Sequence, residues 1–286
     1  MLQLILMAGI VVFAGVAIPP ASAPASSPTS RPTTHSTSQP APSESDVQIR
    51  SILERMEAMG DRVGDLRCRV EYTVEDLIGL SEFTKFGQIL YKRTQPNATF
   101  FITFDKMHEG GIVSRKKEWY LFEDRWLSEA KEVSKTVIRR EVIGKGETVD
   151  LFSLERAPFP IPFGQRKDEI LRHFRVTLAG AEEGDPKNTD HLVCIPRPGS
   201  RLADTYSRLE FFVSRVLDLP VKIVAFEADP DGEPAKIITA LFPDLTSKSI
   251  NSGVSAEAFR LPAETKKYQV VEEPLEEPVR PVPGHR

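Results

Sequence analysis

The stretch Gly87-Gln88-Ile89-Leu90-Tyr91-Lys92-Arg93 decides the fold, together with Glu118-Trp119-Tyr120-Leu121-Phe122 further along the chain. Both are β-like segments in a long series of such segments that follows one amphipathic helix. Apolar and polar residues that alternate over a short segment are typical of a half-buried strand. The series therefore predicts a large antiparallel sheet with one apolar face and little helix to cover it.

The helix comes before the sheet. Apolar residues recur at helical spacing from Val47 to Met59, and Asp46 is the expected N-cap, with Gly60 at the other end. Alternation then takes over, because the next segment has apolar residues on one face and charged residues on the other. The apolar set of this first strand is Leu66, Cys68, Val70 and Tyr72.

The remaining strands follow at short intervals, which favours antiparallel hairpins over crossover connections. They are expected at 85–92, 98–105, 111–115, 118–123, 125–130, 133–142, 174–180, 190–196, 205–214, 219–228 and 234–242. One helical insertion interrupts the series. It is predicted to hold a helix at Thr148–Arg156, a rigid segment at Pro158–Phe163 and a helix at Lys167–His173. The chain is thus expected to be mainly β with a few helices, in the α+β class.

The two ends of the chain differ from its middle. Residues 1–25 hold an uncharged apolar run and small residues of the kind read at cleavage sites, which predicts a signal peptide or an uncleaved anchor. Residues 26–45 are rich in Ser, Thr and Pro and read as a disordered linker, and 263–286 as a disordered Pro/Glu-rich tail. One folded domain is expected at 46–262, in the periplasm or cell envelope.

Composition excludes several function classes. The chain has 286 residues and a net charge of −4, with no basic stripe, so nucleic acid is not an expected partner. The histidines are scattered outside metal-ligand spacings, and no phosphate loop or nucleophile elbow is present, so we expect no metal, no cofactor and no enzyme activity. Cys68 and Cys194 are either bridged or two buried free thiols.

The order of these elements resembles the outer-membrane lipoprotein carrier superfamily (LolA/LolB-like) over residues 46–262. The resemblance rests on the leading helix, Gly87–Arg93 with Pro96 and Asn97, Trp119–Phe122, Phe174–Val176, Leu209–Val213, the Asp231-Gly232 turn and Phe259–Pro262. It implies an incomplete antiparallel β-barrel of about eleven strands. The concave face would be covered by the N-terminal helix and the helical insertion.

The resemblance also implies a site. Carriers of this family hold lipoprotein acyl chains between sheet and helices, and their strand-end arginine, which closes the helical lid by hydrogen bonds, falls on Arg93. Thr94 and Gln95 separate Arg93 from Pro96 here, whereas the family places proline directly after the arginine. We expect the apolar cavity to be lined by Leu66, Val70, Tyr72, Tyr91, Phe101, Trp119 and Phe211.

Two hypotheses about function follow. The first is a secreted binding protein that holds a lipid or lipoprotein acyl chain, with a role in lipoprotein sorting to the outer membrane; each buried methylene would contribute about 0.8 kcal/mol. The second is an envelope-sensing or protein-interaction module that grips a polypeptide, such as a membrane-bound partner protein, with the same half-barrel. The long tether favours the second. A third alternative is that side chains and helices fill the concave face and nothing binds.

Overall fold

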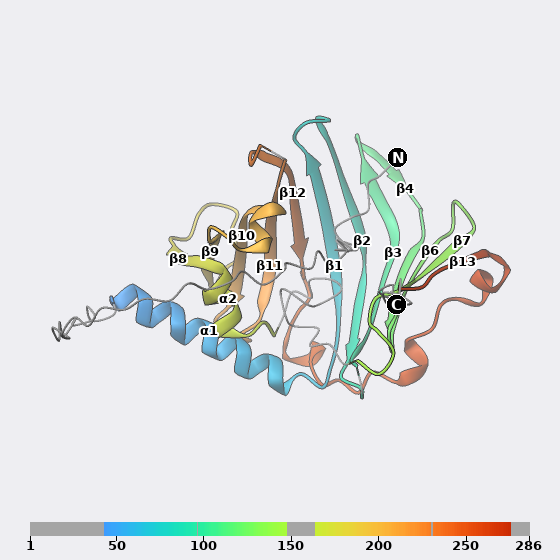
Figure 1. Cartoon of the computed structure of the whole chain (residues 1–286), viewed down its shortest axis with the longest axis horizontal. Helices are drawn as coiled ribbons and strands as arrows, with labels where there is room; N and C mark the ends of the chain where they lie inside the picture. Colours follow the sequence, from blue (N-terminus) through green and yellow to red (C-terminus); the bar gives the residue numbers. More distant parts are fainter. Residues whose placement is uncertain (1–42, 96, 148–163, 230, 276–286) are drawn as a thin grey trace, which may run out of the picture.

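A single open sheet dominates the computed structural model, which describes residues 43–95, 97–147, 164–229 and 231–275 (Figure 1). The sheet has thirteen strands in the order β13-β7-β6-β5-β3-β2-β1-β12-β11-β10-β9-β8, with β4 beside β3. Its edge strands, β8 and β13, do not meet, so the barrel is incomplete. The prediction of an incomplete, mainly antiparallel barrel is confirmed, with thirteen strands rather than about eleven.

The structure gives each element the following bounds. They are α1 (Glu44–Arg62), β1 (Asp65–Asp76), β2 (Ser81–Lys92), β3 (Thr99–Glu109), β4 (Ile112–Ser114), β5 (Glu118–Glu123), β6 (Trp126–Lys131), β7 (Thr136–Glu141), α2 (Lys167–His173), β8 (Phe174–Ala179), β9 (Thr189–Pro196), η1 (Arg201–Asp204), β10 (Tyr206–Ser214), β11 (Pro220–Ala228), β12 (Pro234–Leu241), η2 (Ser247–Ser249), η3 (Ala256–Ala258), η4 (Ala263–Lys267) and β13 (Gln269–Glu273).

Helix α1 begins one turn earlier than its apolar pattern indicates. Ser43 is the N-cap: its Oγ accepts a bond from the Asp46 backbone N–H at 3.1 Å, and the Asp46 carboxylate accepts the Ser43 N–H at 3.2 Å. This reciprocal pair is a capping box. The prediction that Asp46 itself caps the helix was therefore wrong, because its carboxylate serves as the second partner of the box, three residues into the helix.

The core consists of three apolar clusters on the two faces of the sheet. On the inner face, α1 and α2 pack against β8–β12 in what we call the helix-side cluster, and a central cluster covers β1, β2, β3, β5 and β6. An outer cluster lies on the opposite face of β2, β3, β5, β6 and β7. Figure 1 shows α1 below the β8 end of the sheet and away from β6 and β7. The sheet is thus apolar on both faces over much of its width.

Strand β3 carries a bulge opposite Phe86 and Gly87 of β2, because these two residues pair with Lys106 and Phe104 and leave Asp105 without a partner in the register. A Cβ on Gly87 would lie 1.8 Å from the Thr103 carbonyl oxygen of β3, so only glycine allows this close approach of the two backbones. The glycine that opens the stretch Gly87–Arg93 is therefore required by backbone packing.

The described fold extends past the expected domain boundaries. Helix α1 starts at Glu44, inside the expected linker, and η4 and β13 lie in the segment expected to be a disordered tail. The expected helix at Thr148–Arg156, the Pro158–Phe163 segment, the signal peptide and the chain ends fall outside the described residues. Among the described helices, none is long and apolar enough to cross a membrane. Cys68 and Cys194 are both free and buried, so the alternative of a bridge was wrong.

Candidate ligand-binding face

The inner face holds most of the predicted lining residues. Leu66, Val70 and Tyr91 are buried in the central cluster, Phe211 is buried in the helix-side cluster, and Tyr72 packs against both. Burial raises the pKa of the Tyr72 hydroxyl above its ordinary value, and the nearby Glu227 carboxylate adds to the rise. The structure therefore brings these five side chains to one continuous apolar surface.

Phe101 and Trp119 lie on the other face. Strand β3 sends Phe100 and Ile102 into the central cluster and Phe101 into the outer cluster, where Trp119 of β5 also packs. The prediction that Phe101 and Trp119 line the inner face was therefore wrong, because the residues next to them in sequence are the ones that point inward. Alternation could not settle it, because the residues on both faces of these strands are apolar and successive side chains point to opposite faces.

Helix α1 covers the β8 end of the inner face. Ile49, Ile52, Leu53 and Met56 are its buried apolar residues in the helix-side cluster. The segment that leads into α2 crosses α1 closely, since a Cβ on Gly60 would lie 2.4 Å from the Gly164 Cα. Across this junction, the Lys167 backbone N–H donates to the Glu57 carboxylate at 3.1 Å. The two helices therefore form one unit.

Arg93 ties the end of this unit to the sheet. Its Nη2 donates to the Gly60 carbonyl at 2.7 Å and its Nε to the Val63 carbonyl at 3.2 Å, while its backbone N–H bonds to the Gly64 carbonyl at 2.7 Å. Carbonyls at a helix C-terminus lack partners within the helix, and a cation there is favoured by the helix dipole. The residue that the family resemblance selected thus sits at the carbonyl end of α1.

Asn251 also bonds to this junction between α1 and β1. Its Oδ1 accepts the Gly64 N–H at 2.6 Å, and its Nδ2 donates to the Arg62 carbonyl at 3.0 Å. Asn251 has a φ of 53°, in the left-handed region that asparagine tolerates better than most residues. The turn between α1 and β1 is thus held by two side chains that lie far apart in sequence.

A buried ion pair at the other end of the inner face was not predicted. Lys85 Nζ lies 2.7 Å from the Glu118 carboxylate, and the Tyr120 hydroxyl donates to the same oxygen at 2.7 Å. Lys85 is only 6% exposed. Burial raises the pKa of Tyr120 well above its ordinary value, and the Glu118 charge raises it further. The signal was present in the sequence, since Lys85 alternates with Gly87, Ile89 and Tyr91.

The charged region continues across β6 and β7. The Glu129 carboxylate, 6% exposed, lies 2.6 Å from Lys131 Nζ and 3.1 Å from Arg140 Nη1. Arg140 in turn bonds to Glu273 of β13 at 2.7 Å. The inner face is therefore apolar near the end of α1 and charged toward the start of β5.

No metal centre accompanies these groups in the described part of the chain, where no three His, Cys, Asp or Glu side chains could hold an ion. Two surface hollows lined by described residues lie elsewhere. One is near Asp185 and His191, the other near Arg67 and Lys248, and neither includes a predicted lining residue. The described side chains of the inner face are thus apolar, apart from the buried charged groups around Lys85 and Glu129.

Comparisons with known proteins give structural neighbours only. No family model and no curated protein matches the chain. Similar solved structures include the MucA/MucB complex of Pseudomonas aeruginosa, with 16% identity over 78% of this chain and 63% of that chain and a TM-score of 0.41. LppX, a lipoprotein of Mycobacterium tuberculosis, has 9% identity over 71% of this chain and 99% of that one, with a TM-score of 0.39.

A third similar structure is a Vibrio parahaemolyticus domain assigned to outer membrane lipoprotein sorting. It is 12% identical over 74% of this chain and 97% of that chain, with a TM-score of 0.31. Since the TM-scores lie below 0.5, the fold rests on the sheet topology itself.

Proposed function

We propose that this chain is an exported, cofactor-free binding protein of the LolA-like type, without enzyme activity. It holds a lipid or a lipoprotein acyl chain between the inner face and the helices, in the periplasm or cell envelope, and takes part in sorting lipoproteins to the outer membrane. One observation carries the proposal. Near the end of α1 the inner face is apolar from β10 to β6, and its central cluster is buried although α1 lies over the β8 end and reaches this cluster only through its last turn.

The energetics of such binding are favourable. Each methylene removed from water contributes about 0.8 kcal/mol, so ten of them contribute about 8 kcal/mol. Association costs at least about 4 kcal/mol in lost freedom of motion. The burial of ten methylenes on this face would therefore exceed the lower end of the association cost.

Lipid uptake by matched variants tests the proposal. Ile223 lies on the inner face between the two inner clusters, and Ile237 is similarly half-buried on the outer face of the neighbouring strand β12. Ile223→Lys should abolish uptake of a fluorescent fatty acid, whereas Ile237→Lys should retain it. Native mass spectrometry of protein purified from a cell envelope should find bound lipid. Recovery without lipid, together with no probe uptake by the wild type, would rule out the proposal.

The buried charges favour a second candidate function. Lys85, Glu118 and Glu129 present polar groups on the inner face, which suit peptide groups better than hydrocarbon. In this alternative the half-barrel grips a polypeptide, such as a membrane-bound partner protein, and acts in envelope sensing. Cell fractionation distinguishes the two functions, because a carrier occurs in the soluble periplasmic pool and a sensor stays at the inner membrane.

A further inference from the structure

The outer face of the sheet carries a second apolar surface, opposite α1. Five neighbouring strands contribute to it, and their buried side chains form an apolar floor on the face of the sheet away from the central cluster. These floor residues are Leu90, Phe101, Trp119, Leu121, Ala130 and Val137. An apolar surface of this width on a sheet must be covered by another element.

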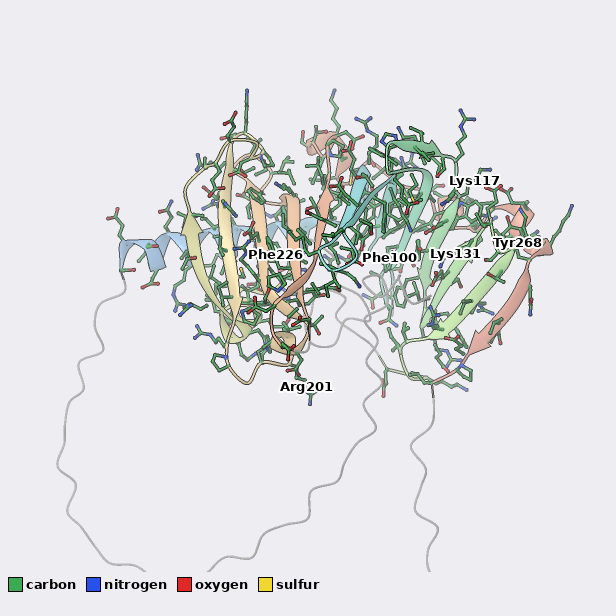
Figure 2. The ribbon with its side chains drawn as sticks, turned by 90° about the horizontal axis from the view of Figure 1, so that it is seen from above. Phe100, Lys117, Lys131, Arg201, Phe226 and Tyr268 are labelled. Atoms are coloured by element: carbon green, nitrogen blue, oxygen red, sulfur yellow. The ribbon has the colours of Figure 1, made fainter. Side chains whose placement is uncertain are left out.

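The cover is the segment Val254–Glu273, which we call the C-terminal strap. Val254, Phe259 and Tyr268 are its buried side chains on the floor, and the path between them contains only short 3-10 turns before β13. Figure 1 shows the strap passing along the lower right of the sheet and rising to β13. Figure 2, seen from above, places Tyr268 at the same end of the molecule as Lys117 and Lys131, away from α1.

Strand β13 differs from the rest of the sheet. It pairs with β7 in parallel, whereas every other pairing among the described strands is antiparallel. All five of its residues are exposed, including Val270 at 54%. Its side-chain ties to β7 are the ion pairs of Arg139 with Glu272 and of Arg140 with Glu273, in which both glutamates are about half exposed. Exposed pairs contribute little to stability.

Tyr268 fits its place on the floor imperfectly. Its side chain is buried, 8% exposed, yet its hydroxyl has no hydrogen-bond partner among the described residues. Lys135 Nζ lies over the ring at 5.1 Å and contacts its face rather than its oxygen. A buried hydroxyl without a partner destabilises the contact that buries it. Packing of the strap on the floor is therefore destabilised by the unsatisfied Tyr268 hydroxyl.

From these observations we propose that the outer floor and the β7 edge form a docking site for an extended polypeptide segment, which the C-terminal strap occupies in competition with it. The incoming segment takes the place of β13 by pairing with β7. Its apolar side chains replace Phe259 and Tyr268 on the floor, and they leave no hydroxyl unpaired. Strand addition of this kind obtains affinity from main-chain hydrogen bonds and specificity from alternate side chains.

Variants that loosen, tighten or lock the strap test the proposal. The probe is a labelled synthetic peptide with the sequence of residues 252–275, and binding to the full chain is followed by fluorescence anisotropy. Phe259→Ser loosens the strap and should strengthen peptide binding at least tenfold. Tyr268→Phe removes the unpaired hydroxyl, tightens the strap and should weaken binding severalfold.

A disulfide provides the internal control. Thr136 and Gln269 are direct partners in the β7–β13 register, so Thr136→Cys with Gln269→Cys can link the two strands. The oxidised form should lose peptide binding and the reduced form should regain it. Equal binding by the oxidised and reduced forms would overturn the proposal, as would no binding by a folded Phe259→Ser variant.

Hydrogen exchange on the wild type tests whether the strap opens, even if Phe259→Ser fails to fold. The amides within Gln269–Glu273 that donate to β7 should exchange at least a hundredfold faster than the paired amides of β6, because the strap opens without the sheet. Exchange of these amides at the rate of β6 would show that the strap is a fixed part of the core, and the proposal would be wrong.

Discussion

The stability of an Arg93→Leu variant should show whether Arg93 holds α1 to the sheet or is only a solvated arginine at the end of a strand. The substitution removes the two guanidinium bonds to the Gly60 and Val63 carbonyls. A bond to a charged group contributes about 1.5–3 kcal/mol, and partial exposure of this site reduces that figure. We expect a loss of about 2 kcal/mol in the free energy of unfolding, or a shift of roughly 4–8 °C in Tm for a domain of this size.

Urea denaturation of the full chain measures this loss. Arg67→Leu is the matched control, because Arg67 lies exposed on the adjacent strand β1, and it should change stability by less than about 0.5 kcal/mol. Arg93→Lys, which keeps the charge but not the paired donors, should recover about half of the loss. If Arg93→Leu and Arg67→Leu are equally stable, the tie at the end of α1 contributes nothing.

The same variant tests the lid. If Arg93 is a latch for α1, Arg93→Leu should still fold but should release bound fatty-acid probe at a changed rate and fail to hand its ligand over. The reasoning is that α1 and α2 form one unit, which the arginine holds to β1 and β2 through the α1 carbonyls. Equal release rates in wild type and variant would leave Arg93 as a static tie.

Three further predictions concern stability and reactivity. Gly87→Ala should lower Tm by more than 10 °C or prevent folding, because the added Cβ would lie 1.8 Å from a carbonyl oxygen of β3; an unchanged thermal melt would contradict this. Burial raises the pKa of the Cys68 thiol to about 12 and also raises that of Cys194, so both should resist a thiol reagent at pH 8 until urea is added; labelling of the native protein would contradict this. Lys85→Met should cost about 3 kcal/mol by leaving the buried Glu118 carboxylate without its cation, and adding Glu118→Leu should restore part of the loss. Urea denaturation of the single and double variants checks this, and a double variant less stable than the single one would be evidence against it.

The sequence predicted the elements whose signals are local. The helix Lys167–His173 has the bounds that its charge and apolar pattern indicated, and the alternation of Leu66 and Val70 placed both on the inner face. The N-cap was missed because Ser43 lies in a serine-rich stretch, where a capping serine looks like its neighbours. Arg93 was found through a family motif rather than through its chemistry.

What failed depended on contacts between distant segments. Strand β13 has five exposed residues, so it has no alternation of burial, and its polar, proline-rich surroundings resemble a tail. The face of Phe101 could not be read from an unbroken apolar run. The burial of Lys85 was not predicted, because a lone lysine within a strand is usually solvent-exposed. Its ion pair with Glu118 offsets the free-energy cost of burying the charge.

The two apolar faces of β2 and β3 have a consequence for folding. In most sheets, a slip of one residue exposes the whole apolar set, and that penalty enforces the alignment of the strands. Here a slip exchanges Leu90 for Tyr91, or Phe101 for Ile102, so that at these positions one apolar side chain replaces another. Steric fit helps to set the alignment, because a Cβ at Gly87 would lie 1.8 Å from the Thr103 carbonyl oxygen of β3. This glycine therefore helps to fix the register of two strands whose faces are both apolar.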